Sequence, residues 1–170
     1  SYINWLRAHL PPASPRLEVG PGDDAAVLRI QNERTVLKVD SVLEGKHFYF
    51  KAPGQKSDAT LGPPATPEEV GRKSLCRPLS DLAAMGAVPL AALCAVALPV
   101  GAGAKLREGL FFGLAKTCAT YGVTLAGGDT QSWEGPLMLS VSVIGEMQGE
   151  RPAIRGGAAP GDVIAVTGSL

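Results

Sequence analysis

Aspartates interrupt the apolar segments of this chain at four places, each beside small or turn-forming residues. Two of them follow the Gly-Pro-Gly turn at 20–22, and the others lie in Val-Asp-Ser, Leu-Ser-Asp-Leu and Gly-Gly-Asp-Thr; the five are Asp23, Asp24, Asp40, Asp81 and Asp129. Carboxylates are seldom found in apolar surroundings unless they are paired or bind a cation. The pattern predicts turns where strands end, with acids gathered there. Grouped carboxylate oxygens suit Mg²⁺ and substrate phosphates, so we expect phosphoryl-transfer chemistry.

Each of these acids also has an ordinary structural explanation. Asp24 and Asp129 fit turn residues whose side chains bond to local amides. Asp81 fits an acid that complements the positive end of a helix. Each acidic turn by itself is weak evidence for a metal and phosphate site, and the set of four together is more specific.

Composition limits the kinds of partner. Lys plus Arg and Asp plus Glu both number 16, so the formal net charge is zero. A nucleic-acid-binding surface normally needs a basic excess, and none is present. The three cysteines, Cys76, Cys94 and Cys118, show no CxxC spacing, so neither a disulfide framework nor a zinc site is indicated. We expect small buried thiols and a reducing cytoplasm.

No secretory signal is visible in residues 1–10, but the segment 82–104 carries no charge and is long enough to cross a bilayer. It is rich in alanine and contains Gly86, Pro89, Pro99 and Gly101. A helix end, a turn and a buried strand explain the same run. We therefore expect no membrane span.

Hydrophobic periodicity and capping residues predict alternating elements. Thr66, Pro67 and Glu69 form a strong helix start, and Gly122 a natural helix stop. The irregular segments expected are a loop over 41–65 and a turn over 155–162. The predicted helices cover 2–10, 66–86 and 104–121. The predicted strands cover 25–30, 34–39, 88–98, 123–126, 137–147 and 163–166.

The order β-β-α-β-α-β-β through residue 147 predicts an α/β (α+β) domain, with a mixed sheet and its helices on one face. The second face of such a sheet also needs a cover. A partner subunit can provide it, so we expect a homodimer that completes the sheet.

Familiar nucleotide and catalytic motifs are missing. There is no GxxxxGK[ST], no GxGxxG, no GxSxG and no HExxH. A phosphate site must then be built from glycine-turn amides, metal ions and individual basic side chains. The turns at 20–22 and 127–128 bring bare backbone close enough for this.

Four segments carry a family resemblance. Gly-Asp-Asp-Ala-Ala at 22–26, the segment Val-Asp-Ser-Val-Leu-Glu-Gly-Lys-His-Phe at 39–48, Leu-Ser-Asp-Leu-Ala-Ala-Met-Gly-Ala at 79–87 and Gly-Gly-Asp-Thr at 127–130 appear in this order. Together they resemble the N-terminal half of thiamine-monophosphate kinase, in the ATP-binding superfamily of aminoimidazole ribonucleotide synthetase. The resemblance runs from about residue 20 to the end of the chain.

The resemblance implies transfer of the γ-phosphoryl group of ATP to thiamine monophosphate, directly and in line. It implies Mg²⁺ at Asp24, Asp40, Asp81 and Asp129, with Asp23 adjacent, and Asp24 and Asp129 as the catalytic residues. Gly128 and Asp129 would meet the nucleotide phosphates. Arg155 would reach ATP, and His47 would contact the thiamine phosphate.

The chain departs from the family pattern at three places. The family usually has Ser or Thr at the two positions before Asp40, where this chain has Lys38 and Val39. We therefore expect one metal site to be weakened, or replaced by the Lys38 ammonium. The loop over 48–66 looks longer than usual and has several lysines, which suits either a substrate lid or a solvated loop. The family continues into a second domain, so we expect residues 1–170 to be one ATP-binding N-terminal domain, without the C-terminal one.

Two other functions stay open on the residues alone. One is another ATP-dependent synthetase of the same superfamily. The other is a nucleotide-binding or dimerisation module without catalysis, in which Lys38 and Val39 disable a metal site.

Overall fold

A mixed six-stranded sheet with two long helices forms the described part of the chain. The structure is a computed structural model, and it describes residues 8–11, 13–31, 33–51, 63–149, 151–166 and 168. In chain order the elements are β1 (Leu17–Val19), β2 (Ala26–Ile30), β3 (Glu33–Leu43), α2 (Pro67–Ala84), β4 (Ala87–Pro99), α3 (Ala104–Tyr121), β5 (Thr124–Trp133) and β6 (Met138–Met147).

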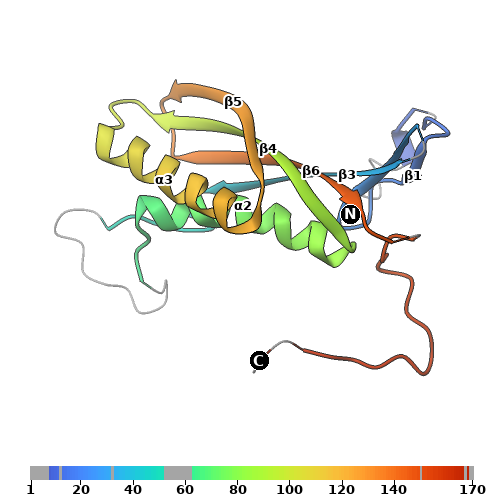
Figure 1. Cartoon of the computed structure of the whole chain (residues 1–170). Helices are drawn as coiled ribbons and strands as arrows, with labels where there is room; N and C mark the ends of the chain where they lie inside the picture. Colours follow the sequence, from blue (N-terminus) through green and yellow to red (C-terminus); the bar gives the residue numbers. More distant parts are fainter. Residues whose placement is uncertain are drawn as a thin grey trace.

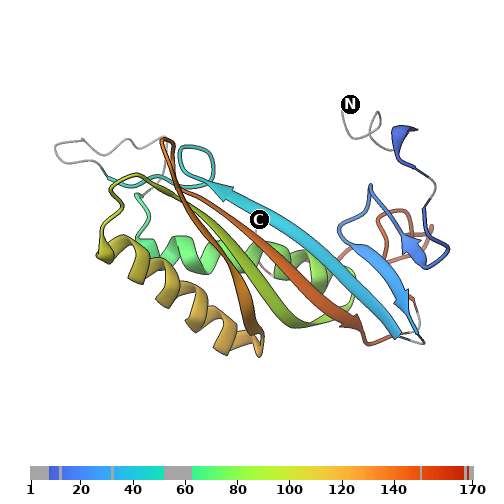
Figure 2. The same cartoon turned by 90° about the horizontal axis from the view of Figure 1, so that it is seen from above.

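The strand order across the sheet is β1-β2-β3-β6-β4-β5. Only β4 and β5 are parallel among these neighbours, and α3 is the crossover that a parallel pair requires. Both helices lie side by side on one face of the sheet, and in the described part of the chain the opposite face carries no helix (Figure 1). Seen from above, β3 and β6 run the length of the molecule (Figure 2). The predicted mixed sheet with helices on one face is confirmed.

The start of α2 forms as its sequence predicts. The Thr66 hydroxyl accepts the N–H of Glu69, and the Glu69 carboxylate accepts the N–H of Thr66, at 2.7 Å. This capping box satisfies two amides that the first turn leaves without partners. The hydrogen bonds also hold the pKa of Glu69 below its usual value. Helix α3 ends at Gly122, in the left-handed conformation with φ 66°.

The core lies between the sheet and the helices. Its largest side chains include Leu75, Leu82 and Met85 from α2 and the following turn, packed against alternate residues of β2, β3 and β6. Cys94 and Cys118 are buried there as free thiols, and burial raises the pKa of Cys94 to about 11. The expected small buried thiols are confirmed at these two positions, while Cys76 is half-buried.

The uncharged segment 82–104 divides into the end of α2, a turn at Gly86 and the central strand β4. Strand β4 carries a register irregularity between Pro89 and Ala91, where proline cannot donate a ladder hydrogen bond. Within the described ranges, no helix is long and apolar enough to cross a membrane.

Three of the four predicted acidic turns are wrong. Asp81 lies inside helix α2, which continues to Ala84. Asp40 lies inside β3, which continues to Leu43, because β6 pairs with it along its whole length. Asp129 lies inside β5 rather than after a short strand. A register shift beside Ala92 and Leu93 places an extra residue in β5, and Gly127 takes φ 152° there, so pairing with β4 resumes beyond it.

Other boundaries also differ from prediction. The predicted strand 163–166 does not form: Val163 and Ile164 are 89% and 95% exposed, and within the described residues no strand pairs with them. An apolar alternation becomes a strand only when a neighbour completes its hydrogen bonds. The short strand β1 was not predicted. Most of the predicted helix 2–10, and the middle of the predicted 41–65 loop, lie outside the described residues.

Candidate active site

Strand β3 and helix α2 are joined by two ion pairs. Residues 36, 38, 40 and 42 of β3 share one face, and Val36 and Val42 on it are buried against the core. Between these valines, the Lys38 ammonium lies 2.5 Å from an Asp81 carboxylate oxygen of α2. The Arg77 guanidinium of α2 lies 3.4 Å from Asp40. The charges alternate, because each element supplies one acid and one base.

Asp23 and Asp24 lie in the turn before β2 and contact the segment that follows β6. The Nε of Arg155 donates to Asp24 at 2.9 Å, and the guanidinium Nη2 forms an ion pair with the same oxygen. The backbone N–H groups of Asp24 and Arg155 both donate to Asp23. This Asp24 contact raises the pKa of Arg155, with smaller contributions from Asp23 and Asp81.

Four predicted site carboxylates therefore belong to one electrostatic neighbourhood, and we call them the acidic group: Asp23, Asp24, Asp40 and Asp81. Three cations, Lys38, Arg77 and Arg155, neutralise most of its charge. All the acidic donors are hard oxygens, which is the chemistry that Mg²⁺ requires. Within the described residues, no three His, Cys, Asp or Glu side chains are yet close enough to enclose a metal ion.

His47 lies in a tight turn directly after β3. Its Nδ1 accepts the N–H of Leu43 at 3.0 Å, so this nitrogen carries no proton. Its backbone carbonyl accepts from the ammonium of Lys73 on α2. Glu44 clamps the turn to the start of β6, since its carboxylate accepts the N–H of Leu137 at 3.0 Å while its own N–H donates to the Leu137 carbonyl. The turn that contains Glu44 and His47 is thus held at both ends by hydrogen bonds.

A hollow of about 670 Å³ opens beside this turn, and we call it the His47 hollow. Three basic side chains of α2, Arg72, Lys73 and Arg77, line it with His47. Arg77 also contacts Asp40, so the hollow and the acidic group share a residue. Sequence reasoning missed these three bases; the available signal was the spacing of Lys73 and Arg77, one helical turn apart.

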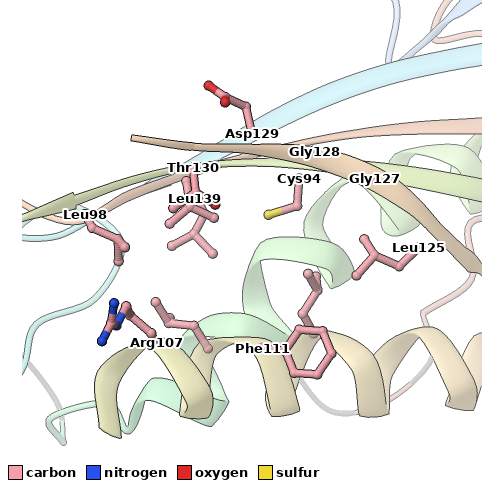
Figure 3. Close-up of a pocket in the computed structure, with 13 residues that line it drawn as sticks. Cys94, Leu98, Arg107, Phe111, Leu125, Gly127, Gly128, Asp129, Thr130 and Leu139 are labelled. Carbon is pink, nitrogen blue, oxygen red and sulfur yellow. The ribbon is translucent and has the colours of Figure 1, made fainter. Parts of the chain in front are cut away.

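Asp129 lies apart from the acidic group. Its side chain points away from the helices and from the cavity between α3 and the sheet (Figure 3). Its carboxylate oxygens have one described contact, with Gln131 at 3.4 Å. The side chain is exposed. Within one chain, Asp129 therefore lies apart from the other four acids, and the site roles predicted for all five stay predictions.

The cavity beneath Asp129 has a volume of about 460 Å³ and an apolar lining. Cys94 and Leu98 of β4 and Phe111 of α3 face it, with Arg107 at one end (Figure 3). It holds no acid directed inward, because Asp129 points away. The ion-paired acids Asp40 and Asp81 lie elsewhere, on β3 and α2.

Residues 22–147 match the family described as AIR synthase related protein, N-terminal domain. This match covers all strands from β2 to β6, both helices, the acidic group and Asp129. The chain belongs to this family.

Similar proteins agree with the family resemblance seen in the motifs. Thiamine-monophosphate kinase of Rhodopirellula baltica is 32% identical over 178 residues, which is 100% of this chain and 52% of that protein. The enzyme of the same name from Corynebacterium glutamicum is 34% identical, over 88% of this chain and 42% of its own length. The chain thus spans about half the length of the curated relatives it matches.

A solved structure described as AaThiL complexed with AMPPCP and TMP has the same fold. It superposes with a TM-score of 0.70 and 28% identity, over 86% of this chain and 41% of its own. The expected AIR-synthase-like N-terminal-domain fold is confirmed by this match and by the family assignment.

Proposed function

We propose that this chain is the nucleotide-binding part of an ATP- and Mg²⁺-dependent kinase that phosphorylates thiamine monophosphate to thiamine diphosphate. The observation that carries the proposal is that Arg77 lies between the acidic group and the basic His47 hollow. A donor phosphate at the acidic group and an acceptor phosphate in the hollow would then be neighbours. The relatives named as thiamine-monophosphate kinases, and the solved structure with AMPPCP and TMP, support this assignment.

The acidic group would hold the magnesium ions that accompany the nucleotide. Bound there, Mg²⁺ would neutralise phosphate charge and orient the γ-phosphoryl group for in-line displacement. The chain's own cations would contribute the remaining charge: Arg155 for the ATP phosphates, and Lys73 and Arg77 for the phosphate of thiamine monophosphate, which His47 would contact. Asp24 is proposed as a catalytic residue beside the ATP phosphates, and its contact with Arg155 supports this.

Gly128 and Asp129 are proposed to meet the nucleotide phosphates from the open face of the sheet. That face exposes Val39, Leu93 and Ile144, which line a hollow of about 460 Å³ together with other apolar residues of β3, β4 and β6. Covering them would remove apolar surface from water. We propose that a second copy of the chain covers this face as a homodimer, and that the protein works in the cytoplasm.

Calorimetric titration of the chain with a non-hydrolysable ATP analogue, with and without Mg²⁺, tests the nucleotide site. Affinity that depends on Mg²⁺ supports it. A parallel titration with thiamine monophosphate tests the His47 hollow, with Lys73→Ala as the variant that should weaken only this ligand. A nucleotide affinity that is the same with and without Mg²⁺ would contradict the proposed role of the acidic group. Equal losses of affinity for the ATP analogue and for thiamine monophosphate in Lys73→Ala would contradict the division between donor and acceptor sites.

A second candidate function rests on the ion pairs themselves. Three acids of the group already have a cationic partner within the chain, and such pairs are common in purely structural networks. A nucleotide-binding or dimerisation module without catalysis would have the same arrangement. Absence of Mg²⁺-dependent binding in the titration would favour this module. Another ATP-dependent synthetase of the superfamily would instead bind the nucleotide with Mg²⁺ and fail to bind thiamine monophosphate.

A further inference from the structure

We infer that the ammonium of Lys38 is the resident counter-ion of Asp81, so that Asp81 takes no divalent cation while this pair is intact. The inference rests on the proposed magnesium and nucleotide site, and it removes Asp81 from the metal ligands proposed there. In this view the positive charge beside Asp81 comes from the Lys38 side chain and not from a bound metal ion.

The geometry of the pair supports a fixed role. The Lys38 Nζ and Asp81 Oδ2 atoms are 2.5 Å apart, and the two side chains are only 22% and 28% exposed. Lys38 stands inside β3, where it pairs with Val143 of β6, and Asp81 lies in the last turn of α2. Since both residues belong to regular elements packed on one core, the backbone holds the two side chains within reach of each other.

The other two cations are held less firmly. Arg155 belongs to a segment without helix or strand, and 67% of its side chain is exposed. Arg77 contacts Asp40 at the longer distance of 3.4 Å. An arriving phosphate or metal ion can displace these two guanidinium groups more readily than an ammonium enclosed between a strand and a helix.

Charge balance gives the consequence. On the β3–α2 face, Lys38 and Arg77 oppose Asp40 and Asp81, so the four side chains sum to zero. A divalent ion at Asp81 would stand a few ångströms from the ammonium and be repelled by it. Repulsion between a unit charge and a doubly charged ion at this range is worth about a factor of ten in affinity even in a water-like dielectric.

The experiment measures Mn²⁺ binding by calorimetry, with Mn²⁺ alone and with a non-hydrolysable ATP analogue. The variants are Lys38→Met, which keeps the aliphatic stem and removes the charge, and Lys38→Arg, which keeps the charge. Arg29→Gln is the matched control, since it also removes one cation from an ion pair, with Glu18, outside the acidic group. Circular dichroism melting verifies that each variant is folded.

The expected result is one additional Mn²⁺ ion, or affinity about tenfold tighter, in Lys38→Met only. Lys38→Arg and Arg29→Gln should stay within about twofold of the unmodified chain. Equal Mn²⁺ binding in Lys38→Met and the unmodified chain overturns the inference. So does a gain of the same size in Arg29→Gln, since the effect would then be one of net charge.

Asp81→Asn supplies an independent variant. If Lys38 occupies Asp81, this change leaves Mn²⁺ affinity of the unmodified background within about twofold; if Asp81 is a ligand, affinity falls by about tenfold or more and the inference is overturned. The proposed function is judged separately, by Mg²⁺-dependent nucleotide binding of the unmodified chain. Failure of that binding alongside a Mn²⁺ gain in Lys38→Met would reject the function and retain the inference.

Discussion

The backbone of Gly128 in β5 lies directly against the backbone of Cys94 in β4. A Cβ atom built at residue 128 would stand 1.9 Å from the Cys94 carbonyl oxygen, far inside any tolerated contact. The two residues are register partners just beyond the irregularity in β5. Glycine at 128 therefore has a structural reason to be present, besides any approach of the backbone to a phosphate.

Gly128→Ala is expected to destabilise the fold by about 3 kcal/mol, because strands β4 and β5 must separate to admit the methyl group. Urea unfolding measures the change. Gly149→Ala is the control: a Cβ there meets nothing within 4 Å, so its effect should stay within about 0.5 kcal/mol. Equal stability of Gly128→Ala and the unmodified chain would show that the strands adjust at no cost.

Asp129→Asn is expected to abolish the Mg²⁺-dependent part of nucleotide binding and to leave stability within about 0.5 kcal/mol, because the side chain is exposed. Calorimetry and urea unfolding report the two quantities. Glu134→Gln removes a similar exposed charge just after β5 and should change neither. Unchanged nucleotide affinity in Asp129→Asn would reduce Asp129 to an ordinary polar residue of the strand.

Arg155→Ala is expected to weaken ATP-analogue binding more than thiamine monophosphate binding. The reason is its position: Arg155 bonds to Asp24, whereas the cations that line the His47 hollow are Arg72, Lys73 and Arg77. Arg151→Ala, a nearby exposed cation on the same segment, is the control. Losses of equal size for the two ligands would argue against a nucleotide role for Arg155.

The capping box gives a pH prediction. Thr66→Ala should cost about 1 kcal/mol of stability at neutral pH. The folded pKa of Glu69 lies below the ordinary value of 4.5, so its stabilisation is complete above that value and is lost as the pH falls through the folded pKa. Urea unfolding of the unmodified chain and Glu69→Gln between about pH 7 and pH 3 should show the difference between them shrinking toward the acid end. A constant difference would contradict the assigned role of the carboxylate.

Val39→Asp is expected to shift the chain toward the monomer, because Val39 is 57% exposed on the open face of the sheet, where a second copy is proposed to pack. Light scattering at high protein concentration measures the mass. Val163→Asp changes a more exposed valine outside the sheet, at 89%, and should leave the mass as it is. A monomeric mass for the unmodified chain at high concentration would reject the homodimer.

Short-range sequence signals were sufficient to predict the positions of α2, α3 and most strands. Thr66 and Glu69 define the start of α2, and Gly122 the end of α3, because capping depends on residues within one turn of the helix. Each family motif likewise consists of residues that are neighbours in sequence. The sequence therefore predicted the fold class, whereas the site roles of the acidic group stay predictions.

Tertiary structure decided what each acid faces. Strand β6 keeps Asp40 inside β3, and the irregularity beside Gly127 keeps Asp129 inside β5, on the opposite face from the helices. The partners of the acids come from distant segments: Lys38 for Asp81, Arg77 for Asp40 and Arg155 for Asp24. Ion pairing depends on distances in space between side chains that are 37 to more than 100 positions apart, so no local pattern contains it.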